Sequence, residues 1–359
     1  GETHYTGKTY VLAGANVTAA EDSAFGNTQE LNIENGATVS FGTGVNQTVG
    51  ALAGEGTLQL GESGGFTIEN YLEVEGEDGN ELISSGTSEI VIHNTVSGAS
   101  GATFTIDGAY GKSGSGNASV VFDDASNNLS GTTFKLLNAN FNIGGTTDND
   151  YKTASSSADF VLSLDSHVTM DAGALSDGEQ YTYNELSFEN GGDLAVTNVT
   201  LANADAPSSA VIETGVLDLT GSGTLSVSAE IDESFDILAN DQDIYESTLI
   251  HYGELKGEPD NLNPSTDFSA SEIQQHNETV AFVKWTGDIV FGEGDEDDDQ
   301  DGTVGMSYSV ESIQLYDESG AGLVLQTTNA TGVDAALSAL VTDYVDASGT
   351  TLAAGNPTL

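Results

Sequence analysis

Short runs of alternating apolar and polar residues recur through about the first two thirds of the chain. Between Tyr5 and about Ser228, runs such as Leu31-Asn32-Ile33 and Phe104-Thr105-Ile106 place apolar side chains at positions i and i+2, with a polar residue between them. Successive side chains of a strand point to opposite faces, so each run predicts a strand with one buried face and one solvated face. Turns rich in Gly, Asn, Asp and Ser separate the runs, as expected between strands.

The spacing of these runs admits two all-β architectures. Many runs recur after about eight to ten residues, which a β-sandwich would also give. Two features favour a stacked solenoid: the composition stays the same over this whole length, and no Pro before Pro207 interrupts a strand ladder. We therefore expect about ten coils of roughly 20–25 residues, with each strand paired to the coils above and below.

The character of the sequence changes after about Ile231. Aromatic residues, Pro259 and Pro264 appear, and an irregular stretch precedes further strand-like runs. We interpret residues 1–230 as the solenoid and residues 231–331 as a β module that caps its end, because an open solenoid end needs covering. From Val333 to Val345 the apolar residues follow a spacing of three and four, which predicts a short terminal helix within residues 332–359.

The charge of the chain restricts its partners. It has 6 Lys, no Arg and 57 Asp plus Glu, giving a formal net charge of −51. No basic patch can be assembled from so few Lys, which excludes nucleic acid as a partner and argues against anionic membranes. No apolar run reaches the roughly 18 residues of a spanning helix, so we expect no membrane insertion of this segment. The absence of Cys excludes disulfides and thiolate zinc sites.

One acidic segment resembles a calcium-binding loop. Asp297, Asp299 and Asp301, followed by Gly302, match the start of the pattern Asp-x-Asp-x-Asp-Gly, in which alternating carboxylates converge on one cation. The twelfth position holds Tyr308, where such loops carry a bidentate Glu. Two interpretations stay open, a calcium site and a solvated acidic loop between two strands.

Catalytic patterns are missing, and one aromatic pair suggests a ligand site. The sequence has no nucleophile elbow and no phosphate loop with the required spacing, so we predict no catalytic residues, no cofactor-binding residues and no enzyme activity. The five His are too far apart for local metal spacing, and we expect each to stand alone. Tyr181 and Tyr183 share one strand face, which predicts a platform for a sugar ring; core packing is the alternative.

Residues near the N-terminus carry a family resemblance. Residues 5–11 (YTGKTYV), 24–26, 31–39 and 46–58 (NQTVGALAGEGTL) follow one another as in the passenger-associated repeat of bacterial autotransporters, which they resemble over about 55 residues. Residues 245–257 are similar to a segment near the C-terminal end of many passengers. Residues 61–228 resemble passengers only in style.

The resemblance implies a right-handed parallel β-helix that is exported and anchored at the cell surface by a C-terminal outer-membrane barrel outside this chain. It implies that residues 231–331 are autochaperone-like and that 332–359 lead toward that barrel. We expect a non-enzymatic adhesin that contacts glycan or protein on host or bacterial surfaces, with self-association as a further option. The alternatives are a passive stalk or export-folding segment and, less favoured, a polysaccharide hydrolase on a β-helix.

Overall fold

The computed structural model describes residues 7–26, 28–70, 73–75, 81–83, 86–111, 114–123, 126–144, 158–176, 179–201, 210–231, 245–268, 271–276, 279–293, 301–316 and 322–325. Strands dominate these residues, accompanied by the short 3₁₀ turns η2 (Ala172–Ala174) and η3 (Pro259–Asn261). The prediction of an all-β protein is therefore confirmed for the described chain. Among these residues, no helix has the length and apolar character needed to cross a membrane.

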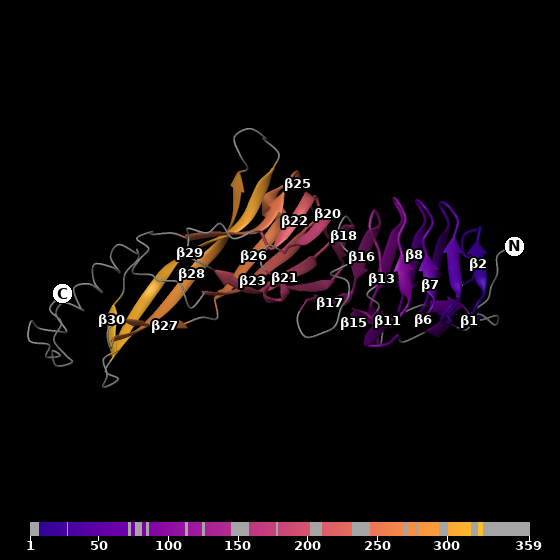
Figure 1. Ribbon diagram of the computed structural model, residues 1–359, viewed down its shortest axis with the longest axis horizontal. Coiled ribbons are helices and arrows are strands. Elements are labelled where there is room, and N and C mark those ends of the chain that lie inside the picture. The colour runs from indigo at the N-terminus through magenta and orange to yellow at the C-terminus, as the bar shows by residue number, and fades with distance from the viewer. Residues whose placement is uncertain are drawn as a thin grey trace, which may run out of the picture.

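Most strands pair in parallel and form four sheets along the molecule (Figure 1). The first long sheet contains, in order, β5 (Asn46–Val49), β8 (Gly65–Glu69), β13 (Thr103–Asp107), β16 (Thr133–Leu137), β18 (Asp159–Ser163), β20 (Tyr181–Glu189) and β22 (Ile212–Leu219). The second long sheet contains β11 (Glu89–Ile92), β15 (Gly116–Phe122), β17 (Ala139–Ile143), β19 (His167–Asp171), β21 (Gly192–Leu201), β23 (Gly223–Ile231) and β26 (Leu262–Phe268).

Two shorter parallel sheets lie toward the N-terminal end. One contains β1 (Lys8–Val11), β3 (Glu30–Ile33) and β6 (Leu52–Gly54), and the other contains β2 (Asn16–Ala19), β4 (Thr38–Phe41), β7 (Thr57–Gln59) and β12 (Thr95–Ser97). Short antiparallel pairs join β9 (Glu73–Glu75) to β10 (Glu81–Ile83) and β14 (Ala109–Tyr110) to β15. The chain thus visits the sheets in turn and adds one strand to each on every circuit.

The length of one circuit grows along the chain. In the N-terminal part, register partners such as Leu31 and Leu52 are 52 − 31 = 21 residues apart, within the expected range. Farther along, Phe104 pairs with Phe134 and Phe134 with Phe160, which are steps of 134 − 104 = 30 and 160 − 134 = 26 residues. The prediction of 20–25 residues per coil is therefore wrong for this region, because the connections between its strands are longer.

A column of aromatic rings fills the space between the two long sheets. Phe66, Phe104, Phe134 and Phe160 follow one another in register, with ring centroids 6.0, 6.0 and 5.5 Å apart and nearly parallel planes. All four side chains are fully buried. Phe122 and Phe141 of the second long sheet meet this column edge-on, so one core runs continuously through these coils.

Parallel pairing gives way to antiparallel pairing after Ile231. β24 (Tyr245–Tyr252) and β25 (Leu255–Gly257) still pair in parallel with β22, but β24 also pairs antiparallel with β29 (Gly302–Tyr316). β28 (Thr279–Glu293) and β29 form a long hairpin, flanked by β27 (Ser271–His276) and β30 (Gly322–Leu325), that extends away from the stacked strands in Figure 1. The change falls where the sequence indicated a new module; its capping role stays a prediction, and the expected helix at 333–345 lies outside the described residues.

Removing a ring from the column should weaken the whole stack. Phe134 contacts the rings of Phe104, Phe122, Phe141 and Phe160, so Phe134→Ala should lower the free energy of unfolding by about 3–5 kcal/mol, as measured by urea denaturation. Tyr10, whose side chain is 57 % exposed, supplies the control, and Tyr10→Ala should change stability by less than about 0.5 kcal/mol. Equal losses at both positions would contradict the ring column as the core.

Close stacking of the coils also restricts particular glycines. Gly54 has φ +90°, and a Cβ there would lie 2.1 Å from the carbonyl oxygen of Ile33 on the preceding coil. Gly36 has φ +77° with no atom within 4 Å of an added Cβ. Gly36→Ala should therefore cost only the backbone strain, about 1–2 kcal/mol, whereas Gly54→Ala should cost clearly more. Thermal unfolding of the two variants measures the difference, and similar losses would show that the coils can separate at Gly54.

Candidate binding site

The scarce basic side chains are used to join coils. Each Lys and His whose side chain is described lies against a carboxylate of another coil, and sequence reasoning, which expected isolated histidines, missed this pairing. The pairs are Lys8 with Glu30, Lys135 with Glu189, Lys256 with Glu185, His93 with Asp123, His167 with Asp193, and His251 with Glu213. Exposed pairs of this kind contribute about 0.2–1 kcal/mol each, so their main effect is to place charges in fixed positions.

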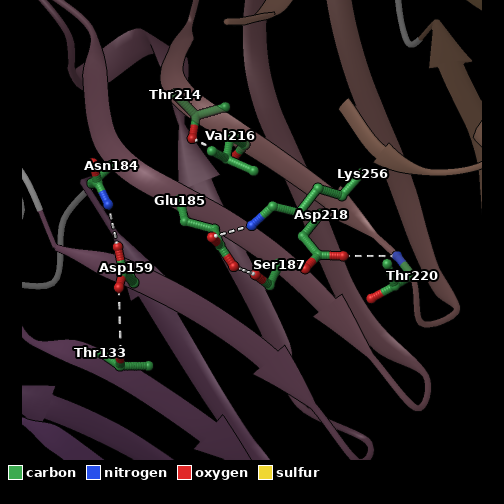
Figure 2. A network of polar contacts seen from close by, with 10 residues as sticks. All are labelled: Thr133, Asp159, Asn184, Glu185, Ser187, Thr214, Val216, Asp218, Thr220 and Lys256. Carbon is green, nitrogen blue, oxygen red and sulfur yellow. Dashed lines mark hydrogen bonds and ion pairs between the residues drawn. The ribbon is translucent and has the colours of Figure 1, made fainter. Parts of the chain in front are cut away.

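The outer face of the first long sheet shows how stacked carboxylates are tolerated (Figure 2). Asp159 and Glu185 are register partners on β18 and β20, so two like charges stand side by side. Glu185 accepts hydrogen bonds from Lys256 Nζ at 2.9 Å and from Ser187 Oγ at 2.8 Å. Asp159 accepts one from Asn184 Nδ2 at 2.6 Å. The hydrogen bond to Glu185 raises the pKa of Lys256, so each acidic group keeps its own donors.

A row of polar side chains crosses the outer face of the second long sheet. Asn140, His167, Asp193 and Thr224 are successive register partners on β17, β19, β21 and β23. Asp193 accepts a hydrogen bond from Thr224 Oγ1 at 2.5 Å through one carboxylate oxygen, and its other oxygen contacts Nδ1 of His167. The carboxylate therefore fixes the orientation of the imidazole ring.

The row borders a polar hollow of about 600 Å³. It lies at the starts of the strands of the second long sheet, beside the connections that arrive from the first. Its lining is polar except for a glycine: Ser115, Asn117, Asn140, Asp165, Ser166, His167, Gly191 and Asp193. A volume of this size is typical of small-ligand sites. A smaller hollow of about 260 Å³ on the same sheet is lined by residues of β21, β23 and β26.

A strained turn forms one side of the polar hollow. Leu164 and Asp165, between β18 and β19, have φ values of +36° and +54°, which are costly for residues other than glycine. Neighbouring coils hold this turn in place. The backbone N–H of Asn138 donates to the carbonyl of Leu164 at 2.7 Å, and the side-chain amide of Asn117 donates to the carbonyl of Asp165 at 2.7 Å. Asp165 is thus kept at the hollow by long-range contacts.

The predicted sugar platform is wrong. Tyr181 and Tyr183 do face the same way, but they face inward, with 1 % and 2 % of their side chains exposed. The hydroxyl of Tyr181 donates to the carbonyl of Asp171 at 2.7 Å, and the ring of Tyr183 stacks on Phe160 at 5.4 Å. Alternation established their shared direction without showing which face was buried, so neither ring can reach a ligand.

The predicted calcium loop is only partly within the described residues. Asp297 and Asp299 lie outside them. Asp301, immediately before β29, is partly buried, and its Oδ1 atom is buried without a hydrogen-bond partner in the described chain. Burial and the charge of Asp301 raise the pKa of Tyr252. The described residues contain no group of three or more His, Cys, Asp or Glu placed to hold a metal ion, and calcium binding stays a prediction.

Comparison with known proteins adds no homologue. No family model matches the chain, and no curated protein or solved structure matches it either. The candidate site therefore depends on geometry alone. Sequence reasoning missed the hollow because its lining residues come from four coils and their register is not visible in a local pattern.

Burial of Tyr181 predicts a loss of stability at high pH. Desolvation, with the charges of Asp171 and Glu179, raises the pKa of Tyr181 to about 12 from 10.0. The unfolded chain then releases this proton first, so the contribution is complete below pH 10 and falls by about 1.4 kcal/mol per pH unit between 10 and 12. Urea unfolding across this range should show a shallower decline for Tyr181→Phe than for the parent protein, whereas Tyr10→Phe should follow the parent. Parallel declines in all three proteins would contradict this effect.

Proposed function

We propose that this chain is an autotransporter passenger segment, a right-handed parallel β-helix displayed outside the cell, which acts as a non-enzymatic adhesin. The parallel register between successive coils and their shared core support this architecture. The segment with the most specific resemblance, residues 46–58, forms β5, β6 and β7, one strand in each of three sheets. One copy of the repeat therefore corresponds to about one circuit of the chain.

The observation that carries the adhesin proposal is an uncharged face on a strongly acidic protein. The outward positions of the sheet β2-β4-β7-β12 carry only hydroxyl and amide side chains, and we call this surface the hydroxyl face. Its residues are Asn16, Thr18, Thr38, Ser40, Thr57, Gln59, Thr95 and Ser97. Parallel pairing places them in rows at the strand spacing of about 4.8 Å, near the N-terminal end in Figure 1.

This face suits weak, repeated hydrogen bonding to another surface. Elsewhere the net charge of −51 repels anionic cell surfaces. Hydroxyl and amide groups donate and accept hydrogen bonds without that repulsion. Thr38, Thr57 and Thr95 repeat along one row, so a partner with its own regular array, such as a neutral surface glycan, can bind several coils at once. Many weak contacts then add through multivalency.

Charge introduced on the hydroxyl face should abolish adhesion without unfolding the protein. Beads coated with the chain should be retained on epithelial or bacterial cells, or on immobilised neutral glycans. The double variant Thr38→Glu, Thr57→Glu should reduce retention by about fivefold or more, because two stacked carboxylates must lose their hydration in the contact. Thr169→Glu, an outward threonine of β19, is the matched control and should retain parental binding.

The rival function is a passive stalk or export-folding segment. Parental beads that are retained on none of these surfaces would support this rival and contradict the adhesin proposal. Equal loss in the hydroxyl-face variant and in the Thr169→Glu control would instead place adhesion elsewhere on the chain. Self-association through the same face and calcium binding near Asp301 remain part of the proposal, the first because two uncharged faces can meet without repulsion.

A further inference from the structure

The polar hollow on the second long sheet has an excess of hydrogen-bond acceptors. Asn140 Nδ2 donates to the carbonyl of Asn117 at 3.1 Å, and Asn117 Nδ2 donates to the carbonyl of Asp165 at 2.7 Å. Because carbonyl oxygens only accept, both amide NH₂ groups must face them. The side-chain oxygen of each Asn is left without a partner in the described chain, so these two residues offer acceptors to a ligand.

The charges of the hollow favour the same kind of ligand. Asp193 is already satisfied by Thr224 and His167, whereas the carboxylate of Asp165 has no hydrogen bond or ion pair to a described residue. No Lys is among the residues that line the hollow. A ligand that binds here must therefore bring donors and positive charge, and an anionic sugar such as a uronic acid would be repelled.

The turn that carries Asp165 is built to hold this carboxylate. Two consecutive left-handed residues cost about 1–3 kcal/mol each, and such strain is typical of binding sites. Two hydrogen bonds from neighbouring coils fix the turn before any ligand arrives, which lowers the entropic cost of binding. Leu164, which precedes Asp165, is 45 % exposed and offers an apolar surface to the C–H face of a pyranose ring.

The geometry points to a site for an amino sugar with a free ammonium group, bound by Asp165 and by the oxygens of Asn117 and Asn140. The pairs His93–Asp123 and His251–Glu213 share the histidine–carboxylate geometry of this row. The unpaired acceptors and the strained turn distinguish the hollow. It lies on a different sheet from the hydroxyl face, so this inference does not depend on the adhesin proposal.

Calorimetric titration of the whole chain with a glucosamine trisaccharide tests the site. The measurement uses physiological salt, because the net charge of the chain attracts any cation at low ionic strength. We expect saturable binding that falls about tenfold or more for the N-acetylated trisaccharide, which lacks the ammonium group, and disappears for a trigalacturonate. Equal binding of the acetylated sugar, or no binding of the amino sugar, would overturn the proposal.

Charge-neutralising variants separate the site from the general field of the protein. Asp165→Asn removes the carboxylate while Asn tolerates the left-handed backbone, so the melting temperature should stay unchanged and affinity should fall about tenfold. Glu62→Gln, at an exposed turn away from the hollow, changes the net charge equally and should bind as the parent does. Equal weakening by both variants would reduce the binding to a field effect. Trilysine that binds as tightly as the sugar, with the same dependence on Asp165, would show a site for cations in general and overturn the sugar assignment.

Discussion

Parallel, in-register pairing between coils is the constraint on which the rest of the structure depends. It places each residue directly against its counterpart one circuit away, so side chains of one kind stack on their own kind. Inside the molecule this stacking is favourable, because Phe66, Phe104, Phe134 and Phe160 form one column of nearly parallel rings. Outside, the same rule brings carboxylates together in a chain with 57 acidic residues, and the repulsion has to be met coil by coil.

The chain meets that repulsion with very few cations. Lys135 and Lys256 each reach a glutamate two coils away, on β20 from opposite sides. Hydroxyl and amide donors satisfy other carboxylates, as Asn184 does for Asp159. The N-terminal sheet avoids the problem, because its outward positions carry no charge. The distribution of charge, and not only its total, therefore decides where another surface can approach this protein.

How much of this was predictable depends on the distance over which each feature is encoded. Alternation is local, and it correctly indicated strands and the shared direction of Tyr181 and Tyr183, but not that this direction is inward. Coil length was predicted well where connections are short and poorly where they lengthen after β13. Pairing of His167 with Asp193 spans 26 residues and depends on register, which sequence alone leaves undetermined.

Longer circuits explain why the polar hollow lies where it does. Strand ladders offer only rows of side chains at fixed spacing, so a concave site needs chain that departs from the ladder. The connections between the long sheets supply it, and the turn at Leu164 and Asp165 leaves the ladder through two left-handed residues. The core below can bear this cost, because Leu162 and Val168 on either side of the turn are fully buried. In this architecture the repeated strands provide rigidity, and the irregular connections provide specificity.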